Sequence, residues 1–345
     1  MEEKYFAAVN SRRGFVSFYG DAFGRARRVF IIKGGPGTGK SYFMRQVAER
    51  CEACGMPVTY IYCSSDPDSL DGITVGDRAA LLDGTSPHAM EATLPGARDE
   101  LIDLGRFWHS DKLFEQRDGI ESLAERKSLH YSTAYRALAA AGELEDAMLS
   151  LALPCLGKQK MTAAARRYLS PFPDGSGFTK TELATSSLGM RGAVHFSTLE
   201  DRARSVISVS GELGLGHLFL AAVIDEAERR GMPVRISRDP LCPDRADTVE
   251  LTDTKTVFSL HAAESGRHVN MKRFIDLHRA AELRREYRAL KSCRDNAVSA
   301  ALGELARAAE YHFALEKIYT AQMDFPAKEA YCRAFADSFV GICKG

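Results

Sequence analysis

The sequence predicts an α/β protein with two tandem copies of one unit, each a mostly parallel sheet flanked by helices and followed by a long helical segment. Three observations support this prediction. Short sequence matches recur at a nearly constant spacing, strand-like apolar runs alternate with helical patterns in each half, and each half ends in helical periodicity alone. At 345 residues the chain is long enough for two ordinary domains, each with its own core.

The clearest sign of duplication is the segment Gly55-Met56-Pro57-Val58, which recurs 176 residues later as Gly231-Met232-Pro233-Val234. Three further matches keep nearly this spacing: residues 14–18 with 192–196, 26–29 with 203–206, and 102–104 with 275–277. Matches in the same order indicate one unit that occurs twice. We place the first domain at residues 1–175 and the second at 185–345, and the Pro- and Gly-rich segment 170–177 is the linker.

Each copy contains strand and helix patterns that complete a βαβ unit of parallel-sheet type. The expected strands are 14–18, 28–32, 58–63 and 79–82 in the first copy and 192–196, 205–209, 234–237 and 254–260 in the second. From about Asp99 to Tyr168, and from about Met271 onward, helical periodicity replaces the strand signals. We expect these segments to cover their sheets or to pack on each other as a bundle. The alternative is a coiled coil that binds a protein partner.

A glycine-rich segment directly after the apolar run 29–32 fits the pattern G-x-x-x-x-G-K-[ST]. Between a strand and a helix this pattern forms the P-loop, or Walker A motif, in which backbone N–H groups surround the β- and γ-phosphates. Lys40 would reach the phosphate oxygens, Ser41 would join a Mg²⁺ shell, and the helix N-terminus would face the same anion. The residues expected to contact the nucleotide are Gly35, Pro36, Gly37, Thr38, Gly39, Lys40, Ser41 and Tyr42.

Further side chains are expected to complete this site. A carboxylate at the end of a neighbouring strand usually holds the Mg²⁺ shell, and Asp83 after the strand 79–82 is predicted to do so. The loop 64–72 contains three carboxylates, of which Asp66 is a candidate for positioning water or receiving a proton; the alternative is an Asx-rich turn. The candidates for a cation that neutralises transition-state charge are Arg78, Arg98 and Arg106.

The second copy keeps the glycines of the loop, in residues 211–218, but not its phosphate-binding side chains. The replacements are Lys40 by His217, Ser41 by Leu218 and Asp83 by Ser259. A leucine cannot ligate Mg²⁺, and a mostly neutral imidazole replaces a permanent cation. We therefore predict one competent nucleotide site in the chain, in the first copy.

The loop around Lys40, the segment 63–72 and the segment 81–88 together resemble those of a bacterial family of uncharacterised ATP-binding proteins with two tandem P-loop domains. The resemblance covers essentially the whole chain. It implies two P-loop NTPase-like domains and ATP binding. Members of the family commonly carry an intact loop in both copies, and this chain departs from that pattern in its second copy.

Bulk properties limit the classes of function. The 46 basic and 46 acidic side chains balance, so a broad electrostatic surface for nucleic acid or an anionic membrane is not indicated. The chain lacks an 18-residue apolar stretch and a signal-peptide pattern, so we expect a cytoplasmic protein with reduced cysteines. The pair Cys51 and Cys54 has no second pair at zinc-site spacing and is interpreted as packing.

The expected function is Mg²⁺-dependent binding and hydrolysis of ATP by a P-loop ATPase with a single site, the second copy being structural or regulatory. Two alternatives stay open: a kinase that phosphorylates a small molecule or nucleotide, and a nucleotide-gated interaction module with negligible turnover. Gly84 stands where a catalytic glutamate would follow Asp83, which favours slow turnover. The loop does not determine the base preference, the phosphoryl acceptor, the protein partner or the oligomeric state.

Overall fold

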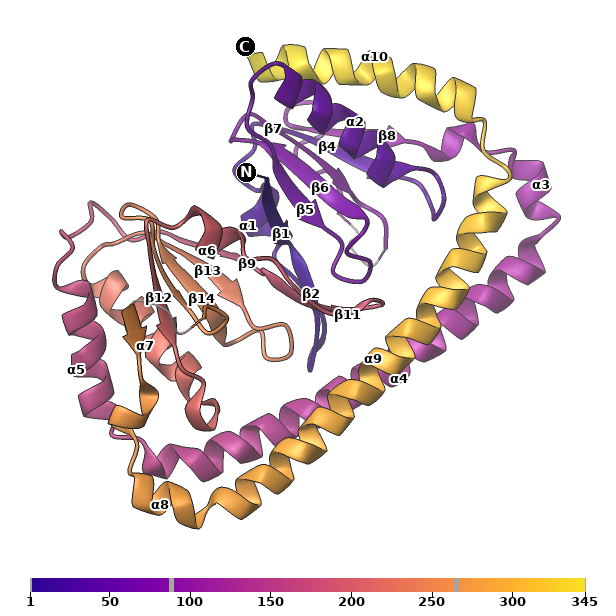
Figure 1. Ribbon diagram of the computed structural model, residues 1–345. Coiled ribbons are helices and arrows are strands. Elements are labelled where there is room, and N and C mark those ends of the chain that lie inside the picture. Colours follow the sequence, from indigo (N-terminus) through magenta and orange to yellow (C-terminus); the bar gives the residue numbers. More distant parts are fainter. Residues whose placement is uncertain (1, 87–89, 264–266, 345) are drawn as a thin grey trace.

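The computed structural model describes residues 2–86, 90–263 and 267–344. It consists of two α/β units at the two ends of a pair of long helices (Figure 1). Both ends of the chain lie in the same unit, because the second long helix brings the C-terminal helix back to the unit that contains the first strand. Within the segment 81–88, Pro87 and His88 lie outside the described residues.

The first unit is built on a six-stranded sheet with the order β1-β5-β6-β7-β4-β8. Its strands are β1 (Glu3–Phe6), β4 (Arg28–Lys33), β5 (Thr59–Tyr62), β6 (Leu70–Val75), β7 (Ala79–Asp83) and β8 (Asp99–Asp103). Neighbouring strands are parallel except at β6, which is antiparallel to β5 and β7. The buried strand β4 lies between β7 and β8, so its C-terminal end is flanked by the ends of two parallel strands.

The second unit repeats this topology strand for strand, in the order β9-β13-β14-β15-β12-β16. Its strands are β9 (Lys180–Leu183), β12 (Ser205–Val209), β13 (Val234–Arg238), β14 (Ala246–Leu251), β15 (Thr256–Ser259) and β16 (Arg267–Val269). Here β14 is the antiparallel strand. The chain is therefore an α/β protein with two similar sheet-and-helix halves, as the repeated sequence matches predict.

The expectation that helical structure begins near Asp99 is wrong, because residues 99–103 form β8, which pairs with β4 in parallel. β8 is an edge strand, and only Asp99 and Ile102 among its residues are buried. A strand with so few buried apolar side chains shows too weak an alternation to be recognised in the sequence.

Each unit also extends a hairpin to the other. The hairpin strands are β2 (Ala8–Ser11) and β3 (Gly14–Ser17) in the first unit, and β10 (Ser186–Gly189) and β11 (Gly192–His195) in the second. The short helices α1 (Tyr19–Phe23) and α6 (Thr198–Arg202) follow them. Phe6 and Ala184 exchange two backbone hydrogen bonds of 2.8 and 2.9 Å between the hairpins' starting points, so the two units are joined directly as well as through the long helices.

The remaining helices occur in equivalent pairs. They are α2 (Lys40–Ala53) and α7 (Gly216–Arg229), α3 (Ser110–Phe114) and α8 (Leu277–Glu282), α4 (Arg117–Ala152) and α9 (Arg284–Thr320), and α10 (Phe325–Lys344) and α5 (Lys158–Leu169). Short 3₁₀ turns are η1 (Gly105–Phe107), η2 (Leu153–Cys155), η3 (Glu212–Gly214) and η4 (Met271–Phe274). In the described part of the chain, no helix combines the length and apolar character that crossing a membrane requires.

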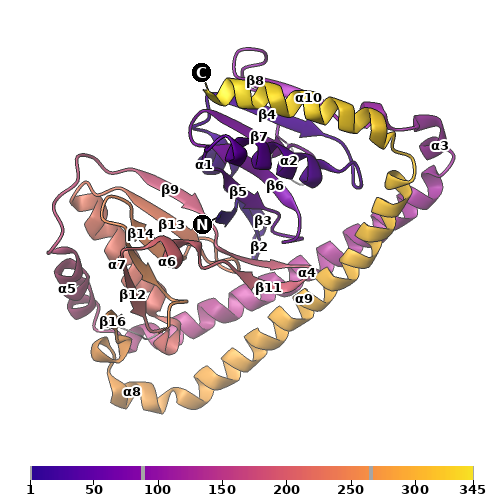
Figure 2. The same ribbon diagram turned by 45° about the horizontal axis from the view of Figure 1, so that its top comes forward.

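The long helices α4 and α9 pack on each other in opposite directions and form an arm between the units (Figures 1 and 2). Their 36 and 37 residues correspond to about 54 Å of helix each. A β-bridge between Trp108 and Met323 joins the two segments at one end of the arm, and a bridge between Leu156 and Ile275 joins them at the other. This is the packing of the helical segments on each other that the sequence pattern favours.

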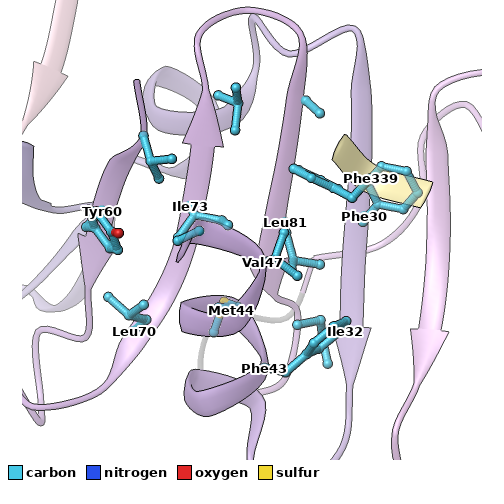
Figure 3. Close-up of a cluster of buried hydrophobic side chains, with 14 of the residues drawn as sticks. Phe30, Ile32, Phe43, Met44, Val47, Tyr60, Leu70, Ile73, Leu81 and Phe339 are labelled. Atoms are coloured by element: carbon cyan, nitrogen blue, oxygen red, sulfur yellow. The ribbon is translucent and has the colours of Figure 1, made fainter. Parts of the chain in front are cut away.

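The arm exchanges the last helices of the two repeats. α5 follows α4 but packs on α7 in the second unit, whereas α10 follows α9 and packs on α2 in the first unit. Two rings of α10, Phe335 and Phe339, contact Phe30 of β4 with centroid separations of 5.1 and 5.5 Å. Figure 3 shows Phe339 beside Phe30 within the core that Phe43 and Leu81 help to form. The C-terminal end of the chain therefore completes the core of the first sheet.

This exchange predicts that a mutation near the C-terminus destabilises the first unit. Replacing the fully buried Phe339 by alanine should lower the free energy of unfolding by about 3–5 kcal/mol, because it leaves a cavity against β4. Phe114→Ala is the matched control, because that ring is 73% exposed. Urea unfolding followed by circular dichroism measures both. Equal stability of the two variants would contradict the packing of α10 in this core.

Candidate functional site

The glycine-rich loop, residues 34–41, connects the end of β4 to the start of α2, as the sequence predicts. Gly37 and Gly39 have φ angles of 72° and 75°, in the left-handed region that favours glycine. A Cβ atom on Gly37 would lie 2.5 Å from the Thr320 hydroxyl and 2.7 Å from the Glu316 carbonyl oxygen. The glycines therefore permit both the turn of the loop and the close approach of α9.

The ammonium group of Lys40 lies inside this loop. It donates hydrogen bonds to the carbonyl oxygens of Gly34 at 2.7 Å and Gly35 at 2.9 Å. The Thr38 hydroxyl, from the same loop, donates to Gly35 O at 3.0 Å. These bonds hold the lysine against the loop backbone with its side chain only 13% exposed, so its charge is concentrated at the start of α2.

Asp83 lies at the same edge of the sheet as the loop. It ends β7, which pairs in parallel with β4 so that Asp83 is opposite Ile32. One carboxylate oxygen accepts hydrogen bonds from Thr85, at 2.8 Å from its backbone N–H and 2.5 Å from its hydroxyl. The other oxygen is 3.5 Å from the Lys40 ammonium. The structure thus brings together Lys40 and the carboxylate that the sequence predicts to accompany it.

Ser41 and the loop 64–72 form the next side of the site. The Ser41 hydroxyl oxygen accepts a hydrogen bond of 3.0 Å from the backbone N–H of Leu70, which ties this loop to the start of α2. Asp66 is buried, and its two oxygens accept from the Ser69 hydroxyl at 3.0 Å and the Asp68 N–H at 3.3 Å. These are the bonds of an Asx-type turn, so Asp66 first of all shapes the loop.

Arg191, from the second unit, reaches this loop through the hairpin of β10 and β11. Its guanidinium is 2.9 Å from the Asp68 carboxylate and 3.9 Å from that of Asp66. The hairpin is fixed in place by a 2.7 Å backbone hydrogen bond from Met190 to Ser65. The equivalent contact occurs in the opposite direction, where Arg13 of the first unit's hairpin is 3.5 Å from Asp244 of the second unit. The repeat of an arginine at both hairpin tips is the signal that sequence reasoning missed.

The arm supplies a third side of the site. The Thr320 hydroxyl of α9 donates a 3.3 Å hydrogen bond to Gly37 O. Burial lowers the pKa of Lys127 on α4. Burial also raises the pKa of Glu316 on α9, assisted by the nearby Asp66 carboxylate. Lys127, Glu316 and Thr320 lie on the two helices of the arm, and the sequence does not identify what these helices pack against. They were therefore not among the predicted site residues.

The three arginines proposed from the sequence are engaged in contacts away from the loop. Arg78 donates to the carbonyl oxygen of Cys343 at the end of α10. Arg98 pairs with its neighbour Asp99 at 2.6 Å. Arg106 stacks over the Tyr331 ring of α10 at 4.4 Å. Two of the three therefore hold α10 in place. The arginines that contact the predicted acidic loop are Arg191 and Arg45 of α2, which donates a 2.8 Å hydrogen bond to the Asp68 carbonyl oxygen.

The corresponding loop of the second unit, residues 211–218, has a different internal structure. His217 contacts the Gly214 carbonyl oxygen through Nδ1 at 2.8 Å, and burial together with Arg245 lowers its pKa, which favours the neutral imidazole. Ser259, at the position of Asp83, donates to the Glu200 carboxylate at 2.6 Å. This loop lacks the lysine and carboxylate that face each other in the first unit.

Ser41 and Asp83 offer oxygen ligands, which suit a hard cation such as Mg²⁺. Within the described ranges, the structure contains no group of three or more His, Cys, Asp or Glu side chains arranged to hold a metal ion.

Comparisons of the chain with protein-family models, with curated proteins and with solved structures find no match. The class of protein therefore follows from its fold and its candidate site alone. It is an α/β protein of two topologically equivalent units. Each has a glycine-rich strand-to-helix loop, and the pair of a loop lysine and an adjacent carboxylate, Lys40 and Asp83, lies in the first unit.

The burial of His312 beside the loop predicts a pH dependence of stability. Burial, then Lys127 and Lys40, lower its pKa from 6.5 to about 4, and the Asp66 carboxylate opposes them. Between these values the unfolded chain binds a proton that the folded protein does not, so stability is lost as the pH falls from 6.5 to 4. His312→Gln should make the melting temperature less dependent on pH in this window. His278→Gln, at an exposed position on α8, is the control and should leave the wild-type slope unchanged.

Proposed function

We propose that the protein binds and hydrolyses ATP with Mg²⁺ at one site in the first unit. The observation that carries this proposal is the position of the Lys40 ammonium within the loop, 3.5 Å from Asp83 at the end of the adjacent parallel strand. Open α/β sheets bind ligands at this edge, and a lysine with a neighbouring-strand aspartate is the pair that P-loop enzymes use. The family resemblance described above implies ATP binding, though not hydrolysis.

Each residue of the site would have a separate role. The loop N–H groups and the N-terminus of α2 would bind the phosphates, and Lys40 would bind the β- and γ-phosphate oxygens. Ser41 and Asp83 would hold Mg²⁺, which when bound neutralises charge on these phosphates. Asp66 would keep the loop 64–72 in position through its turn. Glu316 is a candidate for orienting the attacking water, since its raised pKa makes it a better proton acceptor than an exposed glutamate.

A nucleotide-gated interaction module with negligible turnover is the second candidate. Both oxygens of Asp66 accept hydrogen bonds within their own loop, and Gly84 follows Asp83. The first unit by itself therefore offers little to activate water, and turnover depends on groups that the arm supplies. Tight binding of Mg-ATP without phosphate release would favour this second function.

The first prediction from this proposal concerns the loop lysine. Lys40→Ala should weaken Mg-ATP binding about ten- to hundredfold and abolish phosphate release, because it removes a charged hydrogen-bond donor to the phosphates. His217→Ala changes the equivalent position of the second unit and should leave both quantities unchanged. Calorimetric titration and a phosphate-release assay test the pair. The proposed site is wrong if wild type and Lys40→Ala release phosphate equally.

A second prediction concerns Mg²⁺. Asp83→Asn keeps the shape of the side chain but removes its charge, so the Mg²⁺ concentration needed for half-maximal nucleotide binding should rise about tenfold or more. Asp103→Asn makes the same change at the end of β8, on the other side of β4, and serves as the control. Titrating Mg²⁺ at fixed ATP gives both midpoints. If Asp103→Asn moves the midpoint as far as Asp83→Asn does, Asp83 has no special role.

A further inference from the structure

One lysine of the C-terminal helix is buried against the start of α2. Lys328 of α10 is 1% exposed, although lysines are among the residues least often buried. Its ammonium lies 5.3 Å from the centre of the Tyr42 ring and 5.7 Å from that of Phe325. A Cβ atom on Gly39 would lie 2.9 Å from this nitrogen. The charge therefore sits directly against the last glycine of the loop.

This ammonium has no carboxylate to balance it. Within residues 2–86, 90–263 and 267–344 it makes no ion pair, and its side chain makes no hydrogen bond. The acidic residues nearest to it along the chain are Glu329, the next residue of α10, and Asp324 just before α10, whose carboxylate accepts from the backbone N–H of Ala327. Contacts with two aromatic faces recover part of the cost of burying a charge. They do not balance its charge as a carboxylate would.

Other positive charges near the Lys328 ammonium make its position more unusual. Gly39 is the N-cap of α2, a helix of 14 residues, and helix N-termini carry partial positive charge and unpaired N–H groups. A cation placed there meets a like charge. Lys40 adds a second ammonium at the same end of the helix. An anion bound at the loop would attract each of these positive charges and so offset their mutual repulsion.

We propose that Lys328 is a second phosphate-binding cation, supplied to the loop of the first unit by the last helix of the second repeat. This inference rests on the proposed function and adds to it a binding residue that lies 288 positions after Lys40 in the chain. The ligand class is a polyphosphate-bearing nucleotide. Because α10 continues from α9, the phosphates would hold the end of the arm against the loop.

The test is Lys328→Met, which keeps the length and apolar stem of the side chain and removes its charge. Mg-ATP affinity should fall about ten- to hundredfold, whereas the melting temperature without ligand should stay the same or rise, because an unbalanced buried charge has been removed. Lys317→Met, at an exposed position on α9, is the control for a general loss of positive charge and should bind as wild type does. Titration calorimetry and thermal unfolding give the two quantities.

The outcomes separate this inference from the function on which it rests. If wild type binds no Mg-ATP, the proposed function fails. If wild type binds and Lys328→Met binds equally well, only the role of Lys328 fails. A lower melting temperature of ligand-free Lys328→Met also overturns the inference, since it would show that the ammonium is a structural anchor between two aromatic rings.

Discussion

The antiparallel packing of α4 on α9 is the constraint on which the rest of this structure depends. Each helix carries the chain from one unit to the other over about 54 Å, and each then delivers the helix that completes the opposite unit. The core around Phe30 is closed by Phe339, more than 300 residues away in sequence. Neither sheet is fully covered until the arm has formed, so the two units are expected to fold as one cooperative system.

The two halves share one kind of contact and differ in another. The contact between hairpin and loop occurs in both directions between the units, as Arg191 with Asp68 and as Arg13 with Asp244. The pair formed by Lys40 and Asp83 is kept at one end only. Interactions that hold the units together are thus retained in both halves, whereas the groups suited to phosphate are confined to the first.

Most of the site residues that belong to the first unit could be predicted from the sequence. Lys40, Ser41 and Asp83 depend on a local pattern and on two strands whose apolar residues are consecutive, so their meeting at one sheet edge follows from strand order. Strand β8 could not be recognised, because only one apolar side chain of this edge strand is buried. Arg191, His312 and Lys328 could not be placed either, because their positions depend on the exchange of helices and hairpins, which no local pattern contains.

Residues of α9 and α10 leave no room for side chains at two glycines of the loop. A side chain on Gly37 would collide with the Thr320 hydroxyl and the Glu316 carbonyl, and one on Gly39 would approach the Lys328 ammonium. Glycine at these positions is usually explained by the approach of phosphate to the backbone. Here it is also required for α9 and α10 to reach the loop at all. A group that binds at this loop therefore acts on the junction of α9 and α10, and through α9 on the arm that spans both units. Since the Thr320 bond and the Lys328 ammonium lie on either side of this junction, the position of the arm and the occupancy of the loop are expected to be coupled.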